Sequence, residues 1–501
     1  PKVSKDQGLK IAKDFIGKVS PDIAKNMEYV DRDEQLDIYS DSYNYFFTRT
    51  VNGIPYSENN INITVDNITG EVRDYYTNWD KDIVFSEAKD VISNEKAQEL
   101  YKEKIGLKLI YKTSYMETEP RLYLTYASLR NDVGIDAKNG EVVQIDYYGP
   151  YYEGMDMHMG AKGEENAEDL SPDEQKAVES VSGLISEEEA EKLGRKYLEI
   201  DKDYKLESAN LYKNWKNKGE YKWYLGFVKN VNGVEKYSNV AINAKSKELI
   251  SFYRWTDVNS NKEIKYSEKQ ALDIAKNFIA KTNPEKVNNI EFIESISDSS
   301  RVEGDPQKIV YLNFMRIEDG AYVLDDAIRV SVDLTEGKII EYEIDWYNGK
   351  LPSKDKVISI DEAYDILFDK IGMEVRYTVP SRYDKIDNKK LEAILVYALK
   401  KDRPNDIDAN TGEILDYQGM PYVKREKISY KDIDKSYAKD KINILTQYGI
   451  GFPGDEFKPS EKLTQRDFLF LLAKANNSYL GSDILNNDEK LYSYLMNTGI
   501  V

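Results

Sequence analysis

The chain has 501 residues, a net charge of −20 at pH 7, no cysteine and a single histidine, His158. The negative charge disfavours binding to nucleic acid or to anionic membranes, and no apolar run is long enough to form a transmembrane segment. The lack of cysteine excludes thiol catalysis, disulfides and cysteine-ligated zinc, and a Ser-His-Asp triad is possible only through His158. At about 150 residues per domain, the length predicts three or four units.

The first predicted elements are helices that begin at a serine. Ser4, Ser186, Ser267 and Ser359 are each followed three positions later by Glu or Gln, which is the pattern of a helix capping box. Ser93 opens a fifth helix in the same way, although Lys96 stands where the box has Glu or Gln. Small and apolar residues then recur at helical spacing, so each helix has one face to bury.

Each helix is followed by strand-like sequence that ends in one recurring motif. An aliphatic residue precedes Asp or Asn, and Gly follows in every copy except one, where Lys247 takes its place. An Asp or Asn side chain caps the amides of a tight turn and Gly adopts positive φ, so the motif predicts a β-hairpin with a structural role. The five copies are residues 65–72, 135–142, 242–249, 332–339 and 407–414.

Three of the five units are longer and share two further features. Each has a tight-turn signal, Asn52-Gly53, Asn232-Gly233 or Asp319-Gly320, and each ends in a tryptophan, Trp79, Trp255 or Trp346. The two shorter units both contain Lys-Ile-Gly before a tyrosine-containing strand. Residues 1–149 and 266–419 therefore look like copies of one long-plus-short pair, with a lone long unit between them.

These patterns predict an α+β fold made of tandem repeats, each a helix packed on an antiparallel sheet, followed by a small α-helical module. The predicted segments are a long unit at 1–91, a short unit at 92–152, an acidic linker at 153–184, long units at 185–257 and 258–348, a short unit at 349–422, and the C-terminal module at 423–501.

The repeated unit resembles known modules of secreted proteins. A serine-capped helix, antiparallel strands, Asn52-Gly53-Ile54-Pro55 and the glycine hairpin are similar to PepSY-type and YcdB/YcdC-type repeats of Gram-positive bacteria, and to the propeptide modules of thermolysin-like (M4) metalloproteases. The resemblance implies a PepSY/cystatin-like unit without catalysis of its own, which inhibits, chaperones or binds a protein partner.

The C-terminal residues resemble an S-layer homology (SLH) repeat. The order of Tyr430, Gly449-Ile450, Phe457-Lys458-Pro459 and Thr464-Gln465-Arg466-Asp467 follows that family, and a second, truncated repeat begins near Leu491. The resemblance implies binding to secondary cell-wall polysaccharide and a location outside the cell, at the wall. Gly449, Thr464 and Asp467 are the candidate polymer-binding residues. Gln465 occupies the position of the family's contact arginine, so the resemblance implies a binding groove that lacks its main cation.

Three other sequence patterns each suit either a ligand site or a simpler structural role. Asp408 and its neighbours faintly resemble a calcium loop, but the glycine spacing favours a capped turn. Met155, Met157, His158 and Met159 offer soft ligands to copper, although their place at the start of an acidic segment favours a flexible, unpaired stretch. The three tryptophans suit either sugar stacking or closure of a core. We predict no catalytic, cofactor or metal site.

We therefore expect an extracellular, wall-associated protein that is not an enzyme. Its repeats would bind a partner, a secreted peptidase or cell-wall hydrolase, along exposed sheet faces and edges. One alternative is a wall hydrolase with two carboxylates separated by about 5 to 9.5 Å in a cleft. A second alternative is a passive surface spacer.

Overall fold

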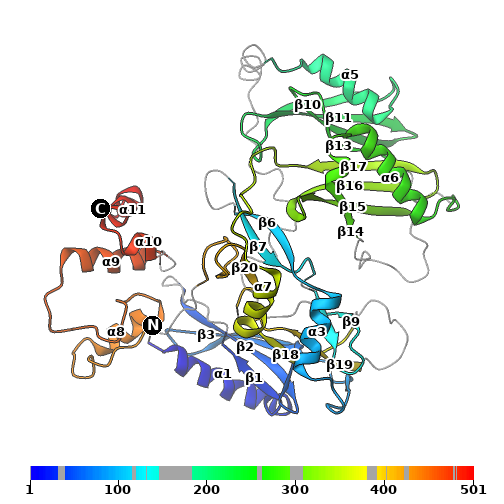
Figure 1. The fold of residues 1–501 in the computed structure, drawn as a ribbon. Coiled ribbons are helices and arrows are strands. Elements are labelled where there is room, and N and C mark those ends of the chain that lie inside the picture. The colour runs from blue at the N-terminus through cyan, green and yellow to red at the C-terminus, as the bar shows by residue number, and fades with distance from the viewer. Residues whose placement is uncertain are drawn as a thin grey trace.

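The computed structural model describes the whole chain except residues 1, 32–39, 115–119, 131, 146–182, 257–261, 294–307, 381–391, 402, 423–427, 478–479 and 481. It is an α+β structure in which helices pack on antiparallel sheets (Figure 1), which confirms the predicted fold class. Most of the predicted linker, with His158 and the three methionines near it, lies outside the described residues.

The N-terminal unit is a helix laid on a four-stranded antiparallel sheet, in the order β1-β2-β3-β4. The side chain of Ser4 accepts a hydrogen bond from the amide of Gln7, and the Gln7 side chain accepts one from the amide of Ser4, so α1 starts at the predicted capping box. Ala12 and Ile16 are fully buried against the sheet. The elements are α1 (Lys5–Val19), α2 (Pro21–Ala24), β1 (Met27–Val30), β2 (Ser42–Val51), β3 (Ile54–Asp66) and β4 (Val72–Asn78).

Two further long units join edge to edge into one sheet, and α5 and α6 cover the same face of it (Figure 1). Strand β13 of the first pairs with β17 of the second, so both units share one core around Trp223, Phe252 and Tyr342. The elements are α5 (Glu187–Leu198), β10 (Lys205–Lys213), β11 (Tyr221–Val231), β12 (Val234–Asn243), β13 (Leu249–Tyr253), α6 (Glu268–Thr282), η1 (Val287–Asn289), β14 (Ile290–Ile293), β15 (Ile309–Glu318), β16 (Ala321–Asp333) and β17 (Lys338–Asp345).

The two predicted short units exchange their hairpins. Strands β6 and β7 of the first pair with β20 and β21 of the second, whereas β18 and β19 of the second pair with β8 and β9 of the first. Strand β5 (Val84–Phe85), which precedes the first short unit, pairs in parallel with β19. The elements of the two short units are α3 (Asn94–Lys104), β6 (Lys108–Ser114), β7 (Arg121–Ala127), β8 (Val133–Asp136), β9 (Val142–Gln144), α7 (Ile360–Ile366), the π-helical turn η2 (Leu367–Ile371), β18 (Met373–Thr378), β19 (Glu392–Leu399), β20 (Asp406–Asp408) and β21 (Ile414–Leu415). Neither short unit thus forms a sheet from its own described strands alone.

The five glycine motifs share one turn geometry. In the first, Oδ1 of Asp66 accepts hydrogen bonds from the amides of Ile68 and Thr69, both at 2.7 Å, and Gly70 has a φ of 77°. Lys247, which replaces the glycine in the third copy, adopts the same left-handed conformation at φ 66°. The motif is therefore a turn built by a side-chain cap, as predicted.

The C-terminal region is helical (Figure 1), and Tyr448, which follows its first helix, interacts with Tyr43 of the N-terminal sheet. Its helices are α8 (Lys439–Gln447), α9 (Gln465–Asn476), α10 (Ser482–Leu485) and α11 (Asp488–Asn497). Leu469, Phe470 and Ala473 of α9 pack with Leu491 and Leu495 of α11 in a small core. Among the described helices, none has the length and apolar character needed to cross a membrane.

Candidate functional site

The described residues contain a buried charged cluster. Part of it, an arginine bonded to a buried polar residue, occurs in two of the long units. Arg49 on β2 and Arg316 on β15 occupy the same place relative to the turns Asn52-Gly53 and Asp319-Gly320. Beyond each turn the returning strand contains a buried polar residue, Asn59 or Asp326. Nη1 of Arg49 donates to Asn59 at 2.9 Å, and Nη1 of Arg316 donates to Asp326 at the same distance.

A bulge of three residues brings these polar groups inward. In the β2–β3 ladder Thr48 pairs with Asn60 but Arg49 pairs with Tyr56. In the β15–β16 ladder Met315 likewise pairs with Ala327 and Arg316 with Val323. The β11–β12 ladder of the lone long unit runs without this interruption. The sequence contains a signal of this bulge, because two of the three Asn-Gly or Asp-Gly turns are followed by three extra residues before the glycine motif. The hairpins predicted above did not include it.

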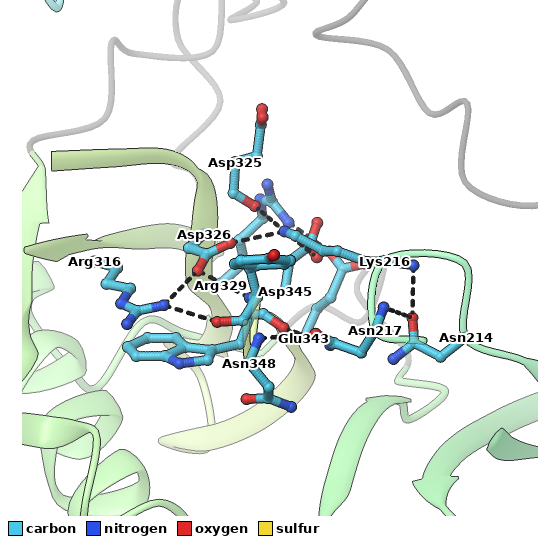
Figure 2. Close-up of polar contacts among 12 residues, drawn as sticks. Asn214, Lys216, Asn217, Arg316, Asp325, Asp326, Arg329, Glu343, Asp345 and Asn348 are labelled. Atoms are coloured by element: carbon cyan, nitrogen blue, oxygen red, sulfur yellow. Dashed lines mark hydrogen bonds and ion pairs between the residues drawn. The ribbon is translucent and has the colours of Figure 1, made fainter. Parts of the chain in front are cut away.

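The cluster is completed by Lys216 from the loop between β10 and β11 (Figure 2). Nζ of Lys216 lies 2.8 Å from carboxylate oxygens of both Asp326 and Asp345, and it donates to the backbone carbonyl of Asp325 at 2.6 Å. The side chains of Lys216 and Asp326 are 6% and 1% exposed. A loop of one unit thus inserts its charge into the bulge of the next.

Lys216 keeps its charge in this buried place. Burial lowers the pKa of Lys216, but the carboxylates of Asp345 and Asp326 outweigh this effect and raise the pKa overall. Neutral hydrogen bonds reinforce the joint, since Nδ2 of Asn217 donates to the carbonyl of Trp346 at 2.8 Å, and the amide of Asn348 donates to Oδ1 of Asn217 at 2.7 Å. The arrangement can fix the orientation of two units.

The three tryptophans of the long units each lie against a cation. Arg49 stacks over Trp79 at 5.2 Å from the ring centroid, Lys236 over Trp255 at 3.6 Å and Arg316 over Trp346 at 4.5 Å. All three tryptophans are half-buried. Such contacts favour the interpretation that each ring closes the end of its unit, over the interpretation as a sugar-stacking platform.

The structure brings Thr464 and Asp467 together and places Gly449 elsewhere. Thr464 is the N-cap of α9, accepting from the amide of Asp467 at 3.1 Å, while Oδ2 of Asp467 accepts from the Thr464 hydroxyl at 2.6 Å. Gly449, at φ 70°, ends α8, and its amide bonds to the carbonyl of Thr446. These contacts give all three residues a structural role, and polymer binding by them stays a prediction.

The arginine next to Gln465 is held by the following helix pair. Nε of Arg466 lies 2.8 Å from Asp488, and its Nη2 donates to the carbonyl of Leu485 at 3.1 Å. Arg466 is therefore engaged in joining α9 to α10 and α11.

Asp408, the first residue of the calcium-like loop, caps its own turn. Its Oδ1 accepts hydrogen bonds from the amides of Asn410 and Thr411, both at 2.8 Å. Within the part of the chain that the structure describes, no group of three or more His, Cys, Asp or Glu residues is placed to hold a metal ion.

Comparison with known proteins agrees with both resemblances. The model of the YcdB, YcdC repeated domain matches residues 1–79 and 187–346, and the model of the S-layer homology domain matches residues 429–469. Among solved structures, the Bacillus megaterium YpeB C-terminal domain is similar at 17% identity and a TM-score of 0.29, over 46% of this chain and 95% of that chain. No curated protein matches the chain. The chain therefore carries YcdB/YcdC repeated domains followed by an S-layer homology domain, which indicates anchoring at the cell surface or cell wall.

Proposed function

We propose that this wall-associated protein is a non-catalytic binding protein. Its repeats hold a protein partner, a secreted peptidase or a cell-wall hydrolase, while the S-layer homology domain attaches the chain to secondary wall polysaccharide. Neither kind of matched domain is a known catalytic domain. The observation that carries the proposal is the face of the sheet formed by β10 to β17 that no described helix covers.

That face is set by the pairing of the strands. Residues directly opposite in antiparallel strands point to the same side of a sheet. One row crosses the sheet through Asn239, Tyr253, Glu341, Ser331 and Tyr311, each directly opposite the next. The neighbouring row, with Phe252, Tyr342 and Val330, belongs to the core under α5 and α6.

The uncovered row combines rings with charge. Tyr253 and Tyr311 are 39% and 49% exposed, and a second row places the ion pair between Arg329 and Glu343, at 3.0 Å, on the same side. Exposed tyrosines among polar groups are typical of protein interfaces, where they bury a large area at a low entropic cost. The composition of this face therefore suits contact with another protein.

The test is titration of secreted metallopeptidases and wall hydrolases against the full chain, with calorimetry and enzyme activity as readouts. We expect saturable binding that the double variant Tyr253→Ser/Tyr311→Ser weakens by at least about tenfold, because anchoring aromatic residues dominate interface energy. The fully exposed Tyr437 supplies the control Tyr437→Ser. Lack of binding to every enzyme tested, or equal binding by both variants, would overturn the proposal.

A further inference from the structure

The junction between the two units of the large sheet shows how two copies of one strand pair. Strand β13 runs antiparallel to β17, with Phe252 opposite Tyr342, Ser251 opposite Glu343 and Tyr253 opposite Glu341. The Phe252 and Tyr342 rings stack with centroids 6.1 Å apart. Beyond them, the amide of Arg254 donates to the carbonyl of Ile340 at 2.7 Å. Both strands are the last strand of their unit, so this joint is an internal pseudo-dimer.

The N-terminal unit ends in a third copy of the same strand, β4. In the β3–β4 ladder Thr64 pairs with Asp74 and Val65 with Val72, which skips one residue. The β16–β17 and β12–β13 ladders skip a residue at the matching position. Because the inner pairing is the same in all three, the same backbone groups of β4, β13 and β17 point outward.

The surroundings of β4 also match those of β17. Tyr75 packs edge-on against Phe15 of α1 with ring centroids 5.6 Å apart, as Tyr342 packs against Phe278 of α6 at 5.3 Å. The next residue, Tyr76, is 63% exposed. No described strand pairs with the outer edge of β4, which is the last strand of its sheet.

We propose that two copies of this chain pair through β4, antiparallel and related by a two-fold axis at Tyr75. The register of the β13–β17 joint then places Asp74 opposite the partner's Tyr76, as Glu341 stands opposite Tyr253. The amide of Thr77 donates to the partner's Arg73 carbonyl, as Arg254 does to Ile340. No two like charges stand directly opposite.

A second copy is the occupant that the structure favours over an unrelated strand. The joint already present in the chain is made by two homologous strands, and an antiparallel register centred on one residue is self-complementary. Pairing also removes an open sheet edge, which would otherwise remain available for aggregation. A dimer carries two S-layer homology domains, so its attachment to the wall gains from bivalency.

The absence of cysteine makes the register directly testable. Asp74→Cys and Tyr76→Cys would be prepared separately as full-length proteins, mixed and oxidised at physiological ionic strength, where repulsion between the chains is screened beyond about 8 Å. Opposite residues of a pair without ladder hydrogen bonds have Cβ atoms about 4.5 to 5.5 Å apart, close enough for a disulfide after a small adjustment. We expect the mixture to form covalent heterodimers at least about tenfold faster than Asp74→Cys mixed with Tyr437→Cys, a control at a fully exposed tyrosine outside β4.

Sedimentation equilibrium of the unmodified chain tests the dimer without any substitution. Thr77→Pro removes one outward amide donor while an edge strand tolerates proline, so we expect this variant to be folded and monomeric. Three outcomes would overturn the proposal: a monomer at all concentrations, cross-linking equal to the control, or a dimer unchanged by Thr77→Pro. The proposal would also be overturned if the outer edge of β4 bound only a strand of another protein. None of these results bears on the uncovered sheet face, so partner binding there is judged separately.

Discussion

The hydroxyl of Tyr397 donates a hydrogen bond to the backbone carbonyl of Ile92 at 2.8 Å, across 305 residues of sequence. The matching contact runs the other way, from the hydroxyl of Tyr126 to the carbonyl of Ile358 at 2.9 Å. Tyr111 and Tyr377 form a second matched pair, donating to the carbonyls of Pro352 and Ser86. The two halves of the repeat region are therefore held together by reciprocal contacts, which the exchange of hairpins creates.

The exchange predicts that the halves need each other. Separate chains of residues 1–152 and 185–501 should associate into a one-to-one complex, because each half lacks the hairpin that completes its second sheet. Light scattering after size-exclusion chromatography measures the complex. We expect Tyr397→Phe and Tyr126→Phe to destabilise the full chain by about 0.5 to 1.5 kcal/mol each. If the two separate chains were folded monomers that do not associate, the exchange of hairpins would be contradicted.

The buried cluster predicts a large effect from one lysine. Lys216→Met should lower the free energy of unfolding by about 3 kcal/mol, because it removes one partner from a buried ion pair and leaves Asp326 paired with the charge of Arg316 and the amide of Tyr347. Urea denaturation followed by the fluorescence of nearby Trp346 measures the loss. Lys431, whose side chain is 82% exposed in its pair with Asp455, provides the control Lys431→Met, for which we expect little change. Similar losses for both variants would count against the cluster as a joint.

Asp66 predicts a stability change at acid pH. Hydrogen bonds from the amides of Thr69 and Ile68, with help from Arg73, lower the pKa of Asp66 from 3.8 to about 2. A lowered folded-state pKa stabilises the fold above the unfolded value of 3.8, and this contribution is lost as pH falls through about 2.

The variant Asp66→Asn isolates the charge, because Asn243 already caps the equivalent turn through its side-chain oxygen at 2.9 Å. We expect it to be less stable than the parent near neutral pH and equally stable below about pH 2. Thermal unfolding over a pH series measures the difference, and a gap that is independent of pH would show that the charge is not responsible.

The S-layer homology region predicts a gain of function. Gln465→Arg should increase the fraction of protein that sediments with purified walls bearing the polymer, because it restores a cation at the first residue of α9. Gln447→Arg, at the end of α8, adds the same charge elsewhere in this region. The polymer-binding prediction fails if both variants sediment alike, or if neither exceeds the parent.

Local pattern determined much of the fold. The capping boxes at Ser4 and Ser267 and the turn capped by Asp66 depend on residues within a few positions of one another, so their chemistry is readable from sequence. Lys247 adopts a left-handed backbone conformation, so the turn forms even in the copy that lacks glycine. The proposed polymer contacts of Thr464 were less readable, because the same side chain serves as a helix cap.

The sequence by itself determined the kind of unit and the number of hairpin motifs. Only the tertiary structure decided which strands pair, since nothing local distinguishes the β8–β9 hairpin in its own half from the same hairpin beside β19. It also decided that Lys216 meets Asp326, because that contact depends on two units joining edge to edge through β13 and β17. Spacing along a chain records local geometry, whereas strand exchange and burial of charge depend on the packing of distant segments.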